Sequence, residues 1–191
     1  MSDKRYLTAQ ALLEDSLALG AQILKSGFRP DFIVGVWRGG TPVGIAVQEL
    51  LEHYGVHADH IAIRTSSYRG MQRDESAAVR VHGLDYVVDS VDAEDALLII
   101  DDVFDTGLSV QAIIERLHKK ARRNAPQAIR IATAYFKPER NRTQIRPDYF
   151  VHETDDWLVF PHEMSGLSDD EIRENKPYLH RIMQELAKRT P

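Results

Sequence analysis

Three aspartates lie close together near the middle of the chain: Asp101, Asp102 and Asp105. An aliphatic run at 97–100 leads directly into the first of them, and such a run is typical of a strand buried on both faces of a parallel sheet. Parallel sheets bind ligands beyond the carboxyl ends of their strands. The three carboxylates therefore fall where an α/β fold holds its ligand, and they suit sugar hydroxyls or a divalent metal ion.

A turn suited to an anion follows the aspartates. Its residues are Thr106, Gly107, Leu108 and Ser109, and an apolar helical pattern begins at 110. Gly107 permits a close approach of the backbone, and the N–H groups at the start of a helix favour a phosphate. The alternative is a helix that Asp105 merely caps, but a cap does not account for all the polar positions together. The pattern predicts a site that grips both ends of one sugar phosphate.

The stretch 97–109 resembles the motif with which the type I phosphoribosyltransferases bind 5-phosphoribosyl 1-pyrophosphate (PRPP). That motif is an apolar strand, two acidic residues, two further residues, Asp-Thr-Gly, one residue, and Thr or Ser. The resemblance implies that PRPP contacts Asp101, Asp102 and every residue from 105 to 109. The chain departs from the motif twice, with Asp101 where Glu is frequent and Ser109 where Thr is commoner, and both departures keep the chemistry.

The rest of the chain alternates between strand and helix patterns. Helices are predicted at 8–25, at 42–54, after 107 and at 168–189, the last interrupted by Pro177; strands are predicted at 32–37, 60–64, 79–81, 86–88, 97–100, 128–136 and 147–151. This indicates an α/β fold with a central, mostly parallel sheet flanked by helices, as in the type I phosphoribosyltransferases. We expect one domain over 1–191, with a core at 28–152 and a small hood formed by 153–191 and the N-terminal segment.

A second turn rich in glycine, Arg38-Gly39-Gly40, follows the strand at 32–37. By itself such a turn is weak evidence, because many strand-to-helix turns need glycine. Beside the PRPP motif it resembles the pyrophosphate loop of the family, which implies that Arg38 and Gly39 bind pyrophosphate and that the Trp37–Arg38 peptide bond is cis. Arg140 and Arg142 are further candidates for pyrophosphate contacts.

The polar stretch 65–76 is longer than most loops in a compact domain. Arg64, Ser67 and Tyr68 resemble the flexible catalytic loop of the hypoxanthine–guanine branch, which closes over PRPP and keeps water out. The resemblance implies that these three residues contact pyrophosphate. The alternative is a plain surface hairpin.

Three features resemble the base site of the 6-oxopurine enzymes. Lys137 follows the strand at 128–136 and would donate to the 6-oxo group, although a Lys at a strand end is most often a solvated charge. Trp157 would stack on the base, although a Trp is usually a core or interface residue. The backbone of Leu158 would read the base edge, and Glu163 would help Asp101 and Asp102 to hold the metal.

Taken together, the resemblance implies transfer of the phosphoribosyl group from PRPP to N9 of a 6-oxopurine, hypoxanthine first and guanine or xanthine next, in purine salvage. Asp105 and Lys137 would be catalytic, with Asp105 as general base, and Mg²⁺ would be the cofactor. The family also implies a homodimer or homotetramer. Two alternatives stay open: a PRPP- or nucleotide-sensing regulatory protein of the same fold, and a phosphoribosyltransferase for a different base.

Composition narrows the remaining classes of function. The chain has 191 residues, a net charge of −5 and no cysteine, so disulfides and thiolate chemistry are excluded. The acidic balance is unlike that of a nucleic-acid binder, and the basic cluster at 119–123 fits the end of a helix better. No apolar run approaches membrane-spanning length and the N-terminus lacks an apolar signal core, so we expect a cytoplasmic protein whose partners are small molecules.

Overall fold

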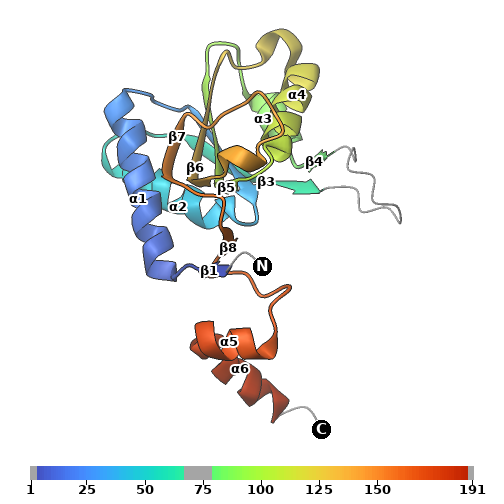
Figure 1. Ribbon diagram of the computed structural model, residues 1–191. Helices are drawn as coiled ribbons and strands as arrows, with labels where there is room; N and C mark the ends of the chain where they lie inside the picture. The colour runs from blue at the N-terminus through green and yellow to red at the C-terminus, as the bar shows by residue number, and fades with distance from the viewer. Residues whose placement is uncertain (1–3, 67–78, 189–191) are drawn as a thin grey trace. The chain divides into compact units, whose positions relative to one another are not determined.

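The computed structural model of the protein describes residues 4–66 and 79–188, and these form two compact units (Figure 1). The first is the core unit, Gln10–Asp155. The second is the hood unit, which combines Met1–Ala9 with Asp156–Pro191.

The core unit is built on a six-stranded sheet in the order β4-β3-β2-β5-β6-β7. Its strands are β2 (Phe32–Trp37), β3 (Asp59–Ser66), β4 (Arg80–His82), β5 (Ala96–Phe104), β6 (Ala128–Phe136) and β7 (Tyr149–Glu153). All neighbouring pairs are parallel except β3 and β4. The predicted α/β fold with a mostly parallel sheet is therefore confirmed.

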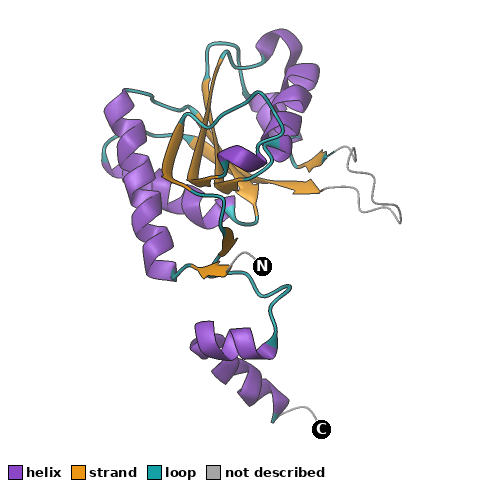
Figure 2. Cartoon of the chain, in the orientation of Figure 1, coloured by secondary structure: helices purple, strands orange, loops and turns teal. Residues whose placement is uncertain are grey.

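Helices flank this sheet on both sides (Figures 1 and 2). They are α1 (Ala9–Ser26), α2 (Gly40–His53), α3 (Asp85–Ser90) and α4 (Leu108–Ala121). Leu97 and Ile99 of β5 belong to the cluster that packs with α3 and α4, whereas α2 packs against β2 and β5 from the other side. All four residues of the aliphatic run at 97–100 are fully buried. This is the burial expected of a parallel strand that is covered on both faces.

The strand order brings the predicted site together. Because β2, β5 and β6 are parallel neighbours, their carboxyl ends meet at one edge of the sheet. The Arg38-Gly39-Gly40 turn follows β2, and Lys137 follows β6. Asp101 and Asp102 lie near the carboxyl end of β5, and Asp105 and the turn at 106–109 come directly after it. Three segments far apart in sequence therefore begin from adjacent strand ends.

One element of the core was predicted wrongly. Residues 86–88 belong to helix α3 and not to a strand. The run Tyr86-Val87-Val88 has strand-like side chains, but only Val87 is buried in the helix, packed in the cluster formed with α4. Tertiary packing thus decides the conformation of a run too short for periodicity to distinguish. The strand predicted at 79–81 is found as β4, one residue later.

The hood unit consists of a two-stranded parallel sheet and two helices. The strands are β1 (Lys4–Tyr6) and β8 (Trp157–Val159), and Lys4 is paired in register with Trp157. Neither strand was predicted, because neither alternates between polar and apolar side chains as β4 does. The helix predicted at 168–189 is two helices, α5 (Asp169–Asn175) and α6 (Pro177–Ala187), interrupted before Pro177 as predicted. Ser168 and Glu171 form the reciprocal bonds of a capping box at the start of α5.

No helix in the described residues of either unit is long and apolar enough to cross a membrane.

Candidate functional site

The turn between β5 and α4 is shaped by Gly107. This residue has φ 77° and occupies the N-cap position of α4. A Cβ atom at Gly107 would lie 2.6 Å from Oγ1 of Thr143 and 2.9 Å from the ring of Phe104. Only glycine fits this backbone, and a glycine cap has no side chain to cover the first N–H groups of the helix. The start of α4 therefore has the geometry of an anion site.

Asp101 and Asp102 form an acidic pair at the end of β5. The N–H of Asp102 donates to Oδ1 of Asp101 at 3.0 Å, and the N–H of Val103 donates to Oδ1 of Asp102 at 2.8 Å. Burial, and secondly the neighbouring Asp102 carboxylate, raise the pKa of Asp101 well above its ordinary value. Two confined carboxylates of this kind favour a cation or hydrogen-bond donors such as sugar hydroxyls.

The glycine turn after β2 packs directly on this acidic pair. A Cβ atom at Gly39 would overlap the Asp102 carboxylate, and one at Gly40 would overlap the Ile100 carbonyl oxygen. The backbone of Gly40 also hydrogen-bonds to Asp101. The Trp37–Arg38 peptide bond is cis, as the family resemblance implied, and the Arg38 side chain is exposed. A loop of backbone amides with one cation therefore lies against two carboxylates.

The segment after β6 lines the other side of the phosphate turn. The N–H of Lys137 donates to the carbonyl oxygen of Phe104 at 2.9 Å, and the N–H of Arg142 donates to that of Thr106 at 3.0 Å. Lys137 is only 5% exposed. These bonds bring the two predicted catalytic residues, Asp105 and Lys137, onto adjacent segments of one site.

Asp105 forms an ion pair that the sequence reading missed. The Nε atom of Arg140 lies 2.7 Å from Oδ1 of Asp105. Arg140 was expected to contact pyrophosphate, whereas the structure pairs it with the predicted general base. Its spacing of three residues from Lys137 was the only signal in the sequence that could have placed it at this strand end.

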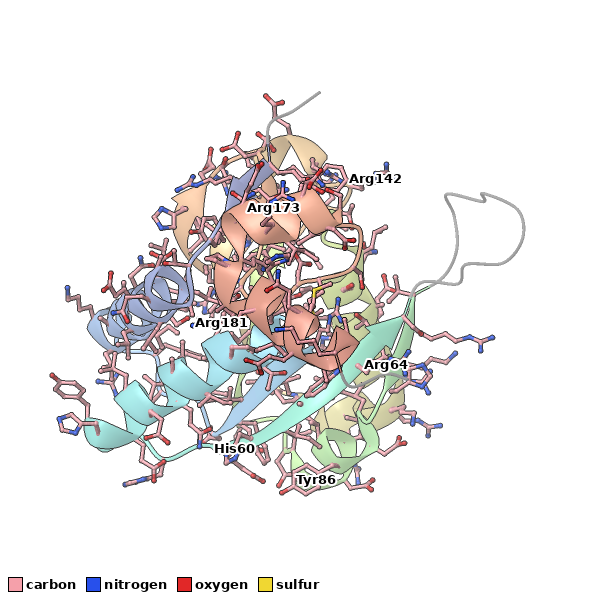
Figure 3. All side chains as sticks on the ribbon, turned by 90° about the horizontal axis from the view of Figure 1, so that it is seen from below. His60, Arg64, Tyr86, Arg142, Arg173 and Arg181 are labelled. Carbon is pink, nitrogen blue, oxygen red and sulfur yellow. The ribbon has the colours of Figure 1, made fainter. Side chains whose placement is uncertain are left out.

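The end of β3 reaches the same edge of the sheet. Figure 3 shows His60 and Arg64 along this strand, and the register places Arg64 beside Trp37 of β2. The hydroxyl of Thr65 donates to Oγ of Ser109 at 3.3 Å, which links β3 to the phosphate turn. Ser67 and Tyr68, which were expected to contact pyrophosphate, lie outside the described residues.

The remaining candidates, Trp157, Leu158 and Glu163, lie in the hood unit. Trp157 is 56% exposed, and the ammonium of Lys4 lies 5.9 Å from the centre of its ring. The side chain of Leu158 is buried, so only its backbone is available to a ligand. The carboxylate of Glu163 accepts the N–H of Phe160 at 3.0 Å.

A mostly parallel sheet with an acidic pair, a turn suited to an anion and a glycine loop at adjacent strand ends is typical of α/β proteins that bind a sugar phosphate or a nucleotide. The sequence profile of the family described as "Phosphoribosyl transferase domain" matches residues 2–169, and the chain belongs to this family. A comparison with curated proteins gave no match.

Solved structures share the fold of this chain. A purine phosphoribosyltransferase from Pyrococcus horikoshii Ot3 is 26% identical with a TM-score of 0.66, and the match covers 87% of this chain and 97% of that one. A hypothetical protein from Neisseria gonorrhoeae with bound ppGpp is 18% identical with a TM-score of 0.73, covering 93% and 98% of the two chains. A hypoxanthine phosphoribosyltransferase from Staphylococcus aureus is 23% identical with a TM-score of 0.57, covering 78% and 75%.

Proposed function

We propose that this protein transfers the 5-phosphoribosyl group of PRPP to N9 of a 6-oxopurine, hypoxanthine first and guanine or xanthine next, in purine salvage. The observation that carries the proposal is the packing of Gly39 and Gly40 on the Asp101–Asp102 carboxylates. This packing puts a loop suited to pyrophosphate beside a pair suited to ribose hydroxyls. The similarity to a purine phosphoribosyltransferase supports the choice of a purine as acceptor.

PRPP is expected to lie across three strand ends. Its 5-phosphate would bind the backbone and hydroxyls of Thr106 to Ser109, and its ribose hydroxyls would bind Asp101 and Asp102. Its pyrophosphate would bind the backbone of Gly39 with the Arg38 and Arg64 side chains. These segments follow neighbouring strands, which supports binding of one molecule by all of them.

The chemistry assigned to this chain is electrostatic and acid–base. As the C1′–oxygen bond breaks, pyrophosphate leaves with the bonding electrons and positive charge grows on the ribose. The carboxylates of Asp101 and Asp102 stabilise that charge. The C1′–N9 bond forms as Asp105 accepts the proton from N7 of the base, and Lys137 donates a hydrogen bond to its 6-oxo group.

The residues present fit a magnesium ion. In the described parts of the chain, no three His, Cys, Asp or Glu side chains are grouped to hold a metal by themselves. Mg²⁺ is usually bound by one or two carboxylates together with substrate phosphates, and the acidic pair provides the protein's share. The ion would screen the charge of the leaving pyrophosphate. Glu163 is proposed as a further ligand, and Trp157 and the Leu158 backbone as the site that binds the base.

A second candidate function is a nucleotide-sensing regulatory protein of the same fold. The observation that favours it is the similarity to a hypothetical protein with bound ppGpp, a guanine nucleotide that carries two diphosphates. A sensor needs the phosphate and ribose contacts but has no need of a proton acceptor. The burial of Lys137 and its position beside the segment that carries Asp105 favour the enzyme.

One assay separates the candidates. Purified protein is incubated with PRPP, Mg²⁺ and, in turn, hypoxanthine, guanine, xanthine, adenine and uracil, and nucleotide formation is followed by chromatography. We expect the fastest turnover with hypoxanthine. Turnover with adenine or uracil alone would assign a different base, and binding of ppGpp without turnover of any base would assign the sensor.

We also propose a homodimer or homotetramer, as the family resemblance implied. Trp37 and Ile45 are 55% and 58% exposed on the core unit, so these apolar side chains are accessible to a partner subunit. Light scattering of the purified protein tests the oligomeric state, and a monomer at all concentrations would contradict the proposal.

A further inference from the structure

A tight turn follows β8 in the hood unit. The N–H of Glu163 donates to the carbonyl oxygen of Phe160 at 3.0 Å, and the N–H of Phe160 donates back to Oε2 of Glu163 at 3.0 Å. The direction of the Glu163 carboxylate is therefore fixed by the backbone of this turn, which we call the hood turn (160–163). The hood turn directly follows β8, so it also fixes the backbone path just after Trp157 and Leu158.

Lys176 reaches into the hood turn from the break between α5 and α6. Its Nζ atom donates to the carbonyl oxygen of Phe160 at 2.7 Å and to that of Pro161 at 3.0 Å. Lys176 is only 3% exposed, whereas lysines are almost never fully buried unless they are paired. The hydroxyl of Tyr178 donates to the same Pro161 oxygen at 3.2 Å. Two side chains from one short segment thus hold two consecutive carbonyl groups.

The break in the helix is what allows this placement. Lys176 has φ −135° and ψ 59°, outside the helical region, and it precedes Pro177. The residue before a proline is disfavoured in the helical conformation, so the sequence itself stops α5 at Asn175. A continuous helix would have kept Lys176 in helical geometry.

Filling the hood core does not require a lysine at this place. A buried ammonium loses its hydration, and an apolar side chain of similar length avoids that cost. Burial lowers the pKa of Lys176, while the charge of Glu163 acts in the opposite direction. The charged end is therefore oriented toward the turn that bears Glu163, and it contacts the backbone of that turn at two points.

We propose that Lys176 is a positioning residue for the hood turn, and that it holds the Trp157–Leu158 segment in the geometry that binds the base. This inference rests on the proposed function. It assigns a role to a residue that contacts neither the base nor the reacting atoms.

The test compares Lys176→Met with Lys188→Met. Lys188 is an exposed lysine of the same unit, so the control makes the same charge change without touching the turn. In Lys176→Met we expect the KM for the base to rise about tenfold, from about 1.4 kcal/mol of lost positioning. The KM for PRPP at saturating Mg²⁺ should change less than about twofold, because its phosphate site lies in the core unit. Lys176→Arg keeps the donors and should recover most of the base affinity.

A second readout does not need turnover. In a Trp37→Phe background Trp157 is the one tryptophan, because the chain has 2. Nucleoside monophosphate binding is then followed by Trp157 fluorescence, and the dissociation constant should rise in Lys176→Met and not in Lys188→Met. If Lys176→Met does not fold, Tyr178→Phe carries the test, with a rise of about two- to threefold expected from the loss of one hydrogen bond.

Different results would reject the proposed function and the positioning role of Lys176. Wild-type protein without turnover of any base rejects the proposed function, whatever the variants do. Wild-type turnover together with an unchanged KM for the base in folded Lys176→Met, or in Tyr178→Phe if that variant is needed, overturns the positioning role alone.

Discussion

Asp105 is held differently from the two aspartates that precede it in the motif. Asp101 and Asp102 are bound to backbone N–H groups at the end of β5, whereas Asp105 faces the guanidinium of Arg140. A carboxylate that is to accept a proton must be placed by its surroundings before the base arrives. The ion pair with Arg140 holds Asp105 from the segment that also carries Lys137.

Asp105→Asn therefore tests the chemical step by itself. We expect kcat to fall about 10²–10⁴-fold, the usual contribution of a general base, because the amide does not accept the proton from N7. PRPP binding should be nearly unchanged, because the phosphate site at 106–109 is intact. Steady-state kinetics and PRPP titration measure the two effects. Asp89→Asn, at an exposed residue of α3, is the matched control, and unchanged turnover in Asp105→Asn would remove this residue from the mechanism.

The acidic pair gives a prediction about pH and stability. Because the pKa of Asp101 is raised in the folded state from 3.8, the folded protein binds this proton more tightly than the unfolded chain does. Ionised Asp101 therefore lowers the free energy of unfolding once the pH rises above the pKa of Asp101 in the unfolded chain. This destabilisation reaches its full size above the pKa of Asp101 in the folded protein. Below 3.8 it disappears.

Asp101→Asn should consequently melt at a higher temperature than the wild type at neutral pH, by about 2–4 °C if about 1 kcal/mol is recovered. The amide oxygen still accepts the backbone N–H groups. PRPP binding should weaken in the same variant, since stability and function are opposed at this position. Calorimetry across pH 3 to pH 8 measures the difference. If the difference in melting temperature between Asp101→Asn and the wild type shrinks as the pH rises, the difference does not come from ionisation of Asp101.

At the scale of elements, an ion pair links strand β1 of the hood unit to helix α5 of the same unit. Nζ of Lys4 in β1 lies 2.5 Å from Oε1 of Glu171 in α5, and the hydroxyl of Tyr6 donates to the same oxygen at 3.1 Å. The bond from Lys4, followed by that from the Ser168 backbone, lowers the pKa of Glu171 from 4.5 to about 2. This stabilisation is present above pH 4.5 and is lost as the pH falls towards 2.

Glu171→Gln should loosen β1 from α5 and leave the core unit unchanged. The expected result at pH 7 is faster hydrogen exchange at the β1 and β8 amides with unaltered exchange in β5. Glu185→Gln, on the exposed surface of α6, is the control for a change of charge alone. Equal protection of β1 in wild type and Glu171→Gln would show that the strand is held by its pairing with β8.

Elements with a strong pattern were the ones that could be predicted. The aliphatic run before Asp101 identified β5, and the order of strands with their terminal Asp, Gly and Lys residues predicted a common site at one edge of the sheet. The capping box of Ser168 and Glu171 is also a local pattern, because its two residues are three positions apart in the sequence. Helix α3 and strands β1 and β8 are too short for periodicity, and their conformations are decided by packing and pairing with distant segments.

At the scale of the whole molecule, the site residues come from segments that the sequence separates widely. The ion pair of Asp105 with Arg140, and the bonds of Lys176 to the hood turn, each join residues whose pairing no local motif records. Sequence could indicate candidate residues for the chemistry, because a sugar phosphate favours particular residue types at particular spacings. It could not indicate which residues hold them, because that depends on the register and loop paths of the folded chain.

Ligand binding tests the whole arrangement, because PRPP should stabilise the protein only when the acidic pair, its metal and the phosphate turn act together. With Mg²⁺ and PRPP at 100 times its dissociation constant, we expect about 2.7 kcal/mol of stabilisation, equivalent to a rise in melting temperature of about 5–11 °C. Chelation of Mg²⁺ should remove most of that rise, since the pyrophosphate charge is then unscreened beside Asp101 and Asp102. Ribose 5-phosphate lacks the pyrophosphate, so its smaller stabilisation should persist under chelation. A PRPP shift that is insensitive to chelation would remove the metal from the acidic pair, and no shift with either ligand would show that the turn at 106–109 does not bind a phosphate.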